Sequence, residues 1–105
     1  MKTQTYMMFR EAILERKQVT CRYNGLHREL CPHVIGDGKD GSPKVLSFQF
    51  AGQTSQGELP PPGEWRCMAI KDIQNVELRI GPWHTGDSHK RPQTCVKRID
   101  VEAGG

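Results

Sequence analysis

Arg28 is the residue whose type and position most clearly suggest binding chemistry in this 105-residue chain. Asn24-Gly25, shortly before it, predicts a two-residue hairpin turn, because both turn positions need positive φ. Such a turn fixes the pairing of the flanking strands and sets Cys21 opposite Arg28. The other residues expected on this strand face are apolar or aromatic: Val19, Cys21, Tyr23, Leu26 and Leu30.

A guanidinium on such a face costs desolvation unless an acceptor offsets it. The planar fork of arginine matches two oxygens of a phosphate or carboxylate, which makes an anion the expected ligand of Arg28. Three alternatives to a bound anion stay open at this point. Arg28 could pair internally with Asp72 or Glu77, it could donate to backbone carbonyls, or its charged end could reach water from the strand edge.

Three further residues complete the expected ligand-binding set. Arg66 lies on a later predicted strand, where it would add a second positive charge to the same concavity. Tyr23 offers a stacking surface and a hydroxyl, and an ordinary core position is the alternative for it. Trp83 lies in the glycine-flanked loop 81–86, where it either stacks on a ligand or plugs the open end of a barrel.

Four cysteines and four histidines raise metal binding and nucleophilic catalysis as alternatives. Their spacings match no standard zinc frame, since there is no C-x-x-C and no H-x-x-x-H pair. No strand-turn-helix elbow surrounds a cysteine, so activation of a nucleophile has no local support. We expect no metal, no cofactor and no catalytic residue. The side chains left without an assigned role are Cys31, His33, His84, His89 and Cys95.

The composition favours a small soluble protein. A net charge of +3 is too low to indicate a dedicated nucleic-acid binder by itself. No apolar leader follows Met1, and no apolar run approaches the roughly 20 residues that cross a bilayer. We therefore expect a cytoplasmic protein without a membrane partner. Its cysteines are expected to be reduced thiols in the core rather than a disulfide framework.

The elements that must position these residues are mostly short strands. The one helix candidate spans residues 5–17, where Tyr6, Phe9 and Ile13 recur at helical spacing. Strands are predicted at 19–23, 26–30, 45–50, 65–70 and 73–80, with a sixth strand or surface arm at 95–101; Pro32 is expected to end the second. This order predicts a mainly β fold, one small bent barrel of about five strands at 18–80 after a short N-terminal helix. The irregular segment 81–105 would extend this single domain, which spans residues 1–105.

The pattern resembles the WYL domain, an Sm-like β-barrel of bacterial transcriptional regulators and defence-associated proteins. The matching motifs are V-x-x-x-Y, R-x-x-x-P, R-x-x-x-I and I-x-x-V, and they extend over roughly residues 5–80. The residues that carry them, with one leucine of the central strand, are Val19, Tyr23, Arg28, Pro32, Leu46, Arg66, Ile70, Ile73 and Val76. The Trp-Tyr-Leu strand that names the family reads Lys44-Val45-Leu46 here. We expect no helix-turn-helix segment ahead of the barrel.

The resemblance implies a standalone ligand-sensing or nucleic-acid-binding regulatory module with a basic pocket. The basic pocket positions of the family fall on Arg28 and Arg66. The expected partner is an anionic small molecule or a nucleic acid. The alternatives are a protein-interaction barrel that forms a homo-oligomer through a sheet edge, and a metal or redox site built on cysteine and histidine.

Overall fold

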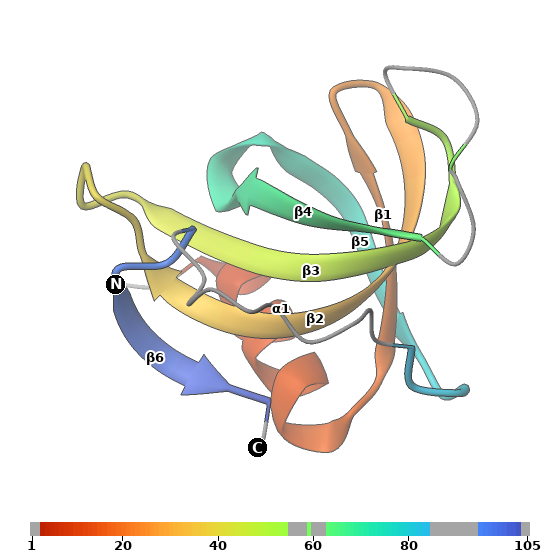
Figure 1. Cartoon of the computed structure of the whole chain (residues 1–105), viewed down its shortest axis with the longest axis horizontal. Coiled ribbons are helices and arrows are strands. Elements are labelled where there is room, and N and C mark those ends of the chain that lie inside the picture. The colour runs from red at the N-terminus through yellow and green to blue at the C-terminus, as the bar shows by residue number, and fades with distance from the viewer. Residues whose placement is uncertain (1–2, 55–58, 60–62, 85–94, 104–105) are drawn as a thin grey trace.

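The computed structural model describes residues 3–54, 59, 63–84 and 95–103. One helix, α1 (Gln4–Glu15), comes first and is followed by a meander of strands (Figure 1). The strands and the single turn of 3-10 helix have these bounds: β1 (Gln18–Tyr23), β2 (Leu26–Asp37), β3 (Pro43–Gly52), β4 (Glu64–Ala69), η1 (Ile70–Asp72), β5 (Ile73–Arg79) and β6 (Arg98–Glu102). The expected order of one helix and five meander strands is confirmed.

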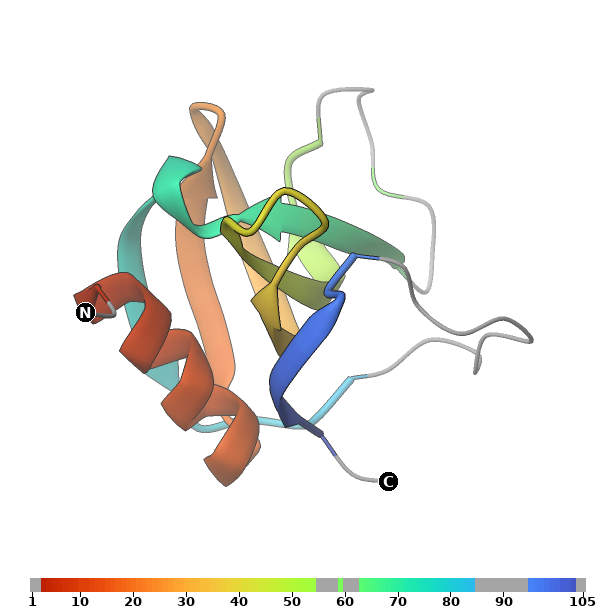
Figure 2. The ribbon, with the colours of Figure 1, turned by 90° about the vertical axis from the view of Figure 1, so that its left-hand side faces the viewer.

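The strands form one strongly bent antiparallel sheet in the order β4-β3-β2-β1-β5, with β6 added to β2. Strands β4 and β5 lie at the two ends of this order, and η1 connects them along the chain. This arrangement is the mainly β fold of about five strands after one helix that the sequence predicted. Figure 2 shows α1 lying alongside β5 and β6 at one side of the bent sheet.

Helix α1 is fixed by its caps and by one buried stripe. The Thr3 hydroxyl accepts a hydrogen bond from the Tyr6 backbone N–H at 3.2 Å, which caps the first turn. Arg16 ends the helix in a left-handed conformation, with φ of 55°. This cap ends the helix two residues before the end of the segment 5–17 predicted from the sequence. Four residues face the core: Tyr6, Phe9, Ala12 and Ile13.

The hairpin of β1 and β2 has the predicted turn and register. Asn24 and Gly25 have φ of 54° and 77°, as a type I′ turn requires. The Cα partners include Cys21 with Arg28 and Tyr23 with Leu26. The expected face is therefore confirmed, and it turns inward.

Pro32 does not end the second strand, so that prediction is wrong. Strand β2 continues to Asp37 through an irregularity in its pairing with β3 between Pro32 and Val34. Pairing with β1 ends at Leu30, and pairing with β6 begins at Val34. Proline is tolerated at this change of partner, because an irregular strand position does not need every ladder hydrogen bond.

We call the face of the sheet that turns toward α1 the inner face, and the opposite one the outer face. The inner face and α1 form the main core, whose larger members are Tyr6, Phe9, Ile13, Val19, Leu30, Ile35, Val45, Met68, Ile70 and Ile73. A smaller cluster covers the outer face, where Val34, Leu46 and Val96 pack with Trp65 and Cys95. Within the described part of the chain, no helix has the length and apolar character needed to span a membrane.

The expectation of four reduced cysteines is wrong for one pair. Cys67 on β4 and Cys95 ahead of β6 form a disulfide, with their Cα atoms 5.5 Å apart. Cys21 and Cys31 are free and buried. The sequence could not show the pair, because the two cysteines are 28 positions apart and only the fold of the C-terminal segment against β4 brings them together.

Candidate anion-binding site

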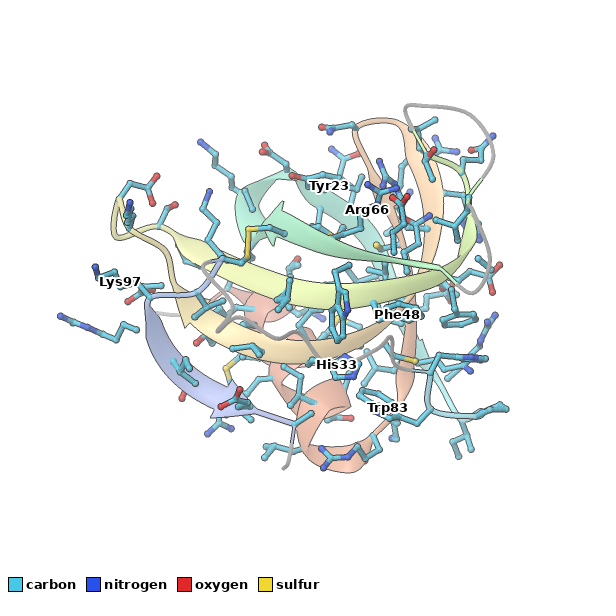
Figure 3. The ribbon with its side chains drawn as sticks, in the orientation of Figure 1. Tyr23, His33, Phe48, Arg66, Trp83 and Lys97 are labelled. Atoms are coloured by element: carbon cyan, nitrogen blue, oxygen red, sulfur yellow. A yellow bond between two sulfur atoms is a disulfide. The ribbon has the colours of Figure 1, made fainter. Side chains whose placement is uncertain are left out.

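Three of the four residues expected to bind a ligand meet on the inner face. Arg28 on β2 is only 4% exposed. Its Cζ atom lies 5.5 Å from the ring centroid of Tyr23, within the range of a cation–π contact. Arg66 comes from β4 and reaches the same hydrogen-bond acceptor as Arg28, the side chain of Gln49. Figure 3 shows Tyr23 and Arg66 on the same side of the molecule.

Gln49 on β3 joins the two arginines. Its Oε1 atom accepts from Arg28 Nη1 at 3.1 Å and from Arg66 Nε at 3.2 Å. The amide nitrogen of Gln49 donates to the backbone oxygens of Ala51 and Gln53 at 3.1 and 3.0 Å. These two bonds fix the orientation of the amide, so that its oxygen must face the guanidinium groups.

The two arginines differ in how their charge is compensated. Arg66 Nη2 lies 2.7 Å from a carboxylate oxygen of Glu64. Arg28 has no carboxylate within 4 Å among the described residues, and its one side-chain acceptor there is the neutral amide of Gln49. The internal pair with Asp72 or Glu77, which the sequence left open, is not formed. Arg28 also does not reach water from the strand edge, since its side chain turns into the core.

One edge of the Arg28 guanidinium has no partner in the described structure. Its Nε atom is fully buried and makes no hydrogen bond. Its Nη2 atom also makes no hydrogen bond to a described residue. The Nε–H and Nη2–H groups of an arginine are parallel donors, which suit two oxygens of one carboxylate or phosphate.

Burial and the nearby Arg66 charge lower the pKa of Arg28 from its ordinary value. An arginine nevertheless keeps its proton in a protein, so this site holds a buried positive charge. The Cys21 thiol opposite Arg28 is no nucleophile: burial raises its pKa to about 12, although the Arg28 charge acts in the other direction. The charge and the free donors of Arg28 suit this site to an anion.

Tyr23 is less a ligand contact than a support for Arg28. Its ring lies beside the guanidinium, and its hydroxyl accepts from the Ala69 backbone N–H at 3.4 Å. This second contact ties β1 to the end of β4. Tyr23 is half-buried, so a bound ligand could reach only part of the ring.

Trp83 lies apart from these residues, on the outer face (Figure 3). Its ring is 4.9 Å from that of His33, which in turn lies 4.8 Å from the ring of Trp65. Phe48 adds an edge contact to Trp65 at 5.3 Å. We call His33, Phe48, Trp65 and Trp83 the aromatic cluster. The structure therefore brings Trp83 together with His33 and not with Arg28, Arg66 and Tyr23.

The remaining cysteine and histidine candidates do not converge. The buried Cys31 thiol accepts a hydrogen bond from the backbone N–H of His84 at 3.2 Å, and the His84 ring stacks on Phe50 at 4.2 Å. In the described part of the chain, no three histidine, cysteine or acidic side chains are grouped as metal ligands. His89 lies outside the described residues.

Sequence reasoning missed Gln49 and Glu64, the two partners of the arginines. A signal for Gln49 existed, because it alternates with Phe48 and Phe50 and must therefore face the side of its strand opposite to theirs. A glutamine at a core position needs partners, as does a buried arginine. Recognising that Gln49 and Arg28 are partners requires the strand order, which is a long-range property of the fold.

Comparisons of this chain with protein-family models, with curated proteins and with solved structures found no match.

Proposed function

We propose that this chain is a ligand-sensing module that binds a small anionic molecule through Arg28, with Arg66 as the second positive charge. The observation that carries the proposal is the buried guanidinium of Arg28 with an unpartnered Nε–H. A buried charge without a counter-charge is destabilising, and an external anion is the group that would offset it.

Gln49 supports the proposal through its chemistry. A glutamate has nearly the same shape and would supply a counter-charge to Arg28, yet a neutral amide occupies this position. The amide holds both guanidinium groups in place and leaves the Arg28 charge without a counter-charge among the described residues. A ligand with a terminal phosphate or carboxylate could then accept from the free edge of Arg28 and from the remaining donors of Arg66.

A small anion is favoured over a nucleic acid because of burial. Arg28 is 4% exposed, while the phosphates of a polymer are recognised by basic side chains at the surface. The net charge of +3 gives no strong additional attraction to a polyanion. Ligand binding would join β1, β2 and β4 through one set of contacts, and this coupling of three strands is the physical basis of the proposed sensing role.

The direct test is calorimetric titration with inorganic phosphate, adenosine monophosphate, succinate and a single-stranded oligonucleotide. Arg28→Lys should bind at least about tenfold more weakly than the wild type, because a bidentate contact is lost. Arg22→Lys is the matched control, since Arg22 lies on β1 of the same hairpin and is exposed. It should bind as the wild type does.

Gln49→Glu provides an independent test. The new carboxylate would lie between the two guanidinium groups and should abolish binding of the small anions. Unchanged affinity in both Arg28→Lys and Gln49→Glu would refute the site. Salt-sensitive binding of the oligonucleotide alone would instead identify a nucleic-acid partner and overturn the choice of a small anion.

A further inference from the structure

The disulfide between Cys67 and Cys95 fastens the start of the C-terminal segment to the edge strand β4. Cys95 and Val96 pack on the outer-face cluster together with Val34, Leu46 and Trp65. The next residue, Lys97, donates its backbone N–H to the Asp37 oxygen at 2.8 Å. Residues 95–97 therefore form a short cover over the outer face, and the disulfide is its covalent attachment.

The strand that follows is held by separate contacts. Strand β6 pairs with β2 from Val34 to Asp37, and the Ala103 N–H donates to the His33 oxygen at 2.6 Å. The Tyr6 hydroxyl donates to the Asp100 carboxylate at 2.6 Å, and Arg10 lies 3.3 Å from the same oxygen. Breaking the disulfide should thus loosen residues 95–97 without releasing β6.

The four cysteines differ in how a thiol reagent can reach them. Cys67 is exposed, and Cys95 is half-buried. Cys21 and Cys31 are buried free thiols, and burial raises the pKa of both. Thiol chemistry in the folded protein should therefore be confined to the Cys67–Cys95 pair.

We propose that Cys67–Cys95 is a thiol–disulfide exchange site that attaches and releases the cover formed by residues 95–97. The reaction partner is a dithiol reductant. Its thiolate attacks the exposed Cys67 sulfur, which forms a mixed disulfide with Cys67 and releases Cys95 as a thiolate that takes up a proton. The second thiol of the reductant, after losing its proton, then displaces Cys67. The protein gains two electrons and two protons, and the reductant becomes a disulfide.

Release would change the outer face rather than the site at Arg28. Without the link, residues 95–97 lose their covalent attachment to β4 and keep non-covalent contacts, which include the packing of Val96 and the hydrogen bond of Lys97. The side chains of Trp65 and Leu46 would then become transiently accessible to solvent. This inference is independent of the proposed anion binding, because Cys67 and Arg66 point to opposite faces of β4.

The experiment treats the folded, air-oxidised protein with dithiothreitol and follows thiols and amide hydrogen exchange together. Before reduction, two thiols should be titratable after denaturation, and four should be titratable after reduction. Reduction should proceed without unfolding and should lower the protection of the Lys97 amide by at least about tenfold. The Ala103 amide is the internal control and should keep its protection.

The double variant Cys67→Ser/Cys95→Ser should show the Lys97 exchange of the reduced protein and no response to dithiothreitol. Four titratable thiols in the denatured, air-oxidised protein would overturn the proposal. It would also be overturned by a disulfide that is reduced only in denaturant, or by Lys97 protection that is the same before and after reduction.

Discussion

Arg28 on the inner face and His33 on the outer face each bury a nitrogen atom that has no hydrogen-bond partner among the described residues. The two cases have different physical outcomes. His33 can lose its proton: its Nδ1 atom lies 2.7 Å from the Cys31 oxygen, which places the remaining proton there and leaves Nε2 as an unprotonated acceptor. Burial lowers the pKa of His33, which favours this neutral form.

Arg28 cannot become neutral by losing a proton, because a guanidinium stays charged when it is buried. The surroundings of Arg28 must supply negative charge, or the buried charge destabilises the folded state. The outer face therefore carries a histidine that can become neutral, whereas the inner face carries a charge that has no counter-charge among the described residues. A buried polar atom without a partner indicates a ligand only where the group cannot become neutral.

The largest expected effect concerns the aromatic cluster. Trp65→Ala should lower the free energy of unfolding by about 3 kcal/mol, because it removes contacts with His33, Phe48 and the outer-face cluster. Urea denaturation measures the change. A loss well below about 1 kcal/mol would mean that the aromatic cluster is not the structural unit described above.

A smaller effect separates the two arginines. Arg66→Met breaks the pair with Glu64 and should lower the free energy of unfolding by about 1 kcal/mol, since both side chains are partly exposed. Arg28→Met removes a buried charge without a counter-charge and should leave stability unchanged or raise it. Urea denaturation in anion-free buffer compares the two. A loss of about 3 kcal/mol or more in Arg28→Met would show that Arg28 has a strong internal partner.

The smallest effect is a pH dependence that belongs to the outer face. Because the pKa of folded His33 is below its ordinary value of 6.5, the unfolded chain binds more protons in mild acid. The stabilisation by His33 is therefore complete above pH 6.5 and is lost as the pH falls through the lowered folded-state pKa. Denaturation at about pH 7 and about pH 5 should show a smaller decrease for His33→Phe than for the wild type. Equal decreases would contradict the assignment of a buried neutral imidazole.

Much of the fold could be predicted from the sequence because the signals were local. Asn24-Gly25 determined the hairpin and its register, so that the position of Arg28 on the apolar strand face followed from strand alternation alone. Tyr6, Phe9 and Ile13 marked the buried side of the helix. The extension of β2 beyond Pro32 was missed, because it depends on pairing with β3 and β6, which lie farther along the chain.

The candidate site was predicted in part for the same reason. Tyr23 and Arg28 belong to one hairpin, so their proximity could be predicted from local sequence. Arg66 lies near them because of the strand order. Trp83 was placed with them on residue type alone, and its partner His33 is distant in sequence. The disulfide likewise depends on a long-range contact between β4 and the C-terminal segment. No spacing rule reports such a contact.

The most direct measurement of the central claim is the Nε–H signal of Arg28 in a ¹H–¹⁵N NMR spectrum, assigned by its disappearance in Arg28→Lys. In anion-free buffer this signal should be protected from exchange with solvent, because Arg28 Nε is fully buried. Addition of inorganic phosphate or adenosine monophosphate should shift it strongly and leave the Nε–H signal of exposed Arg22 in place. If the Arg28 signal stays unchanged at anion concentrations that saturate any binding seen by calorimetry, or if none of these anions binds, the account of Arg28 as an anion receptor is contradicted.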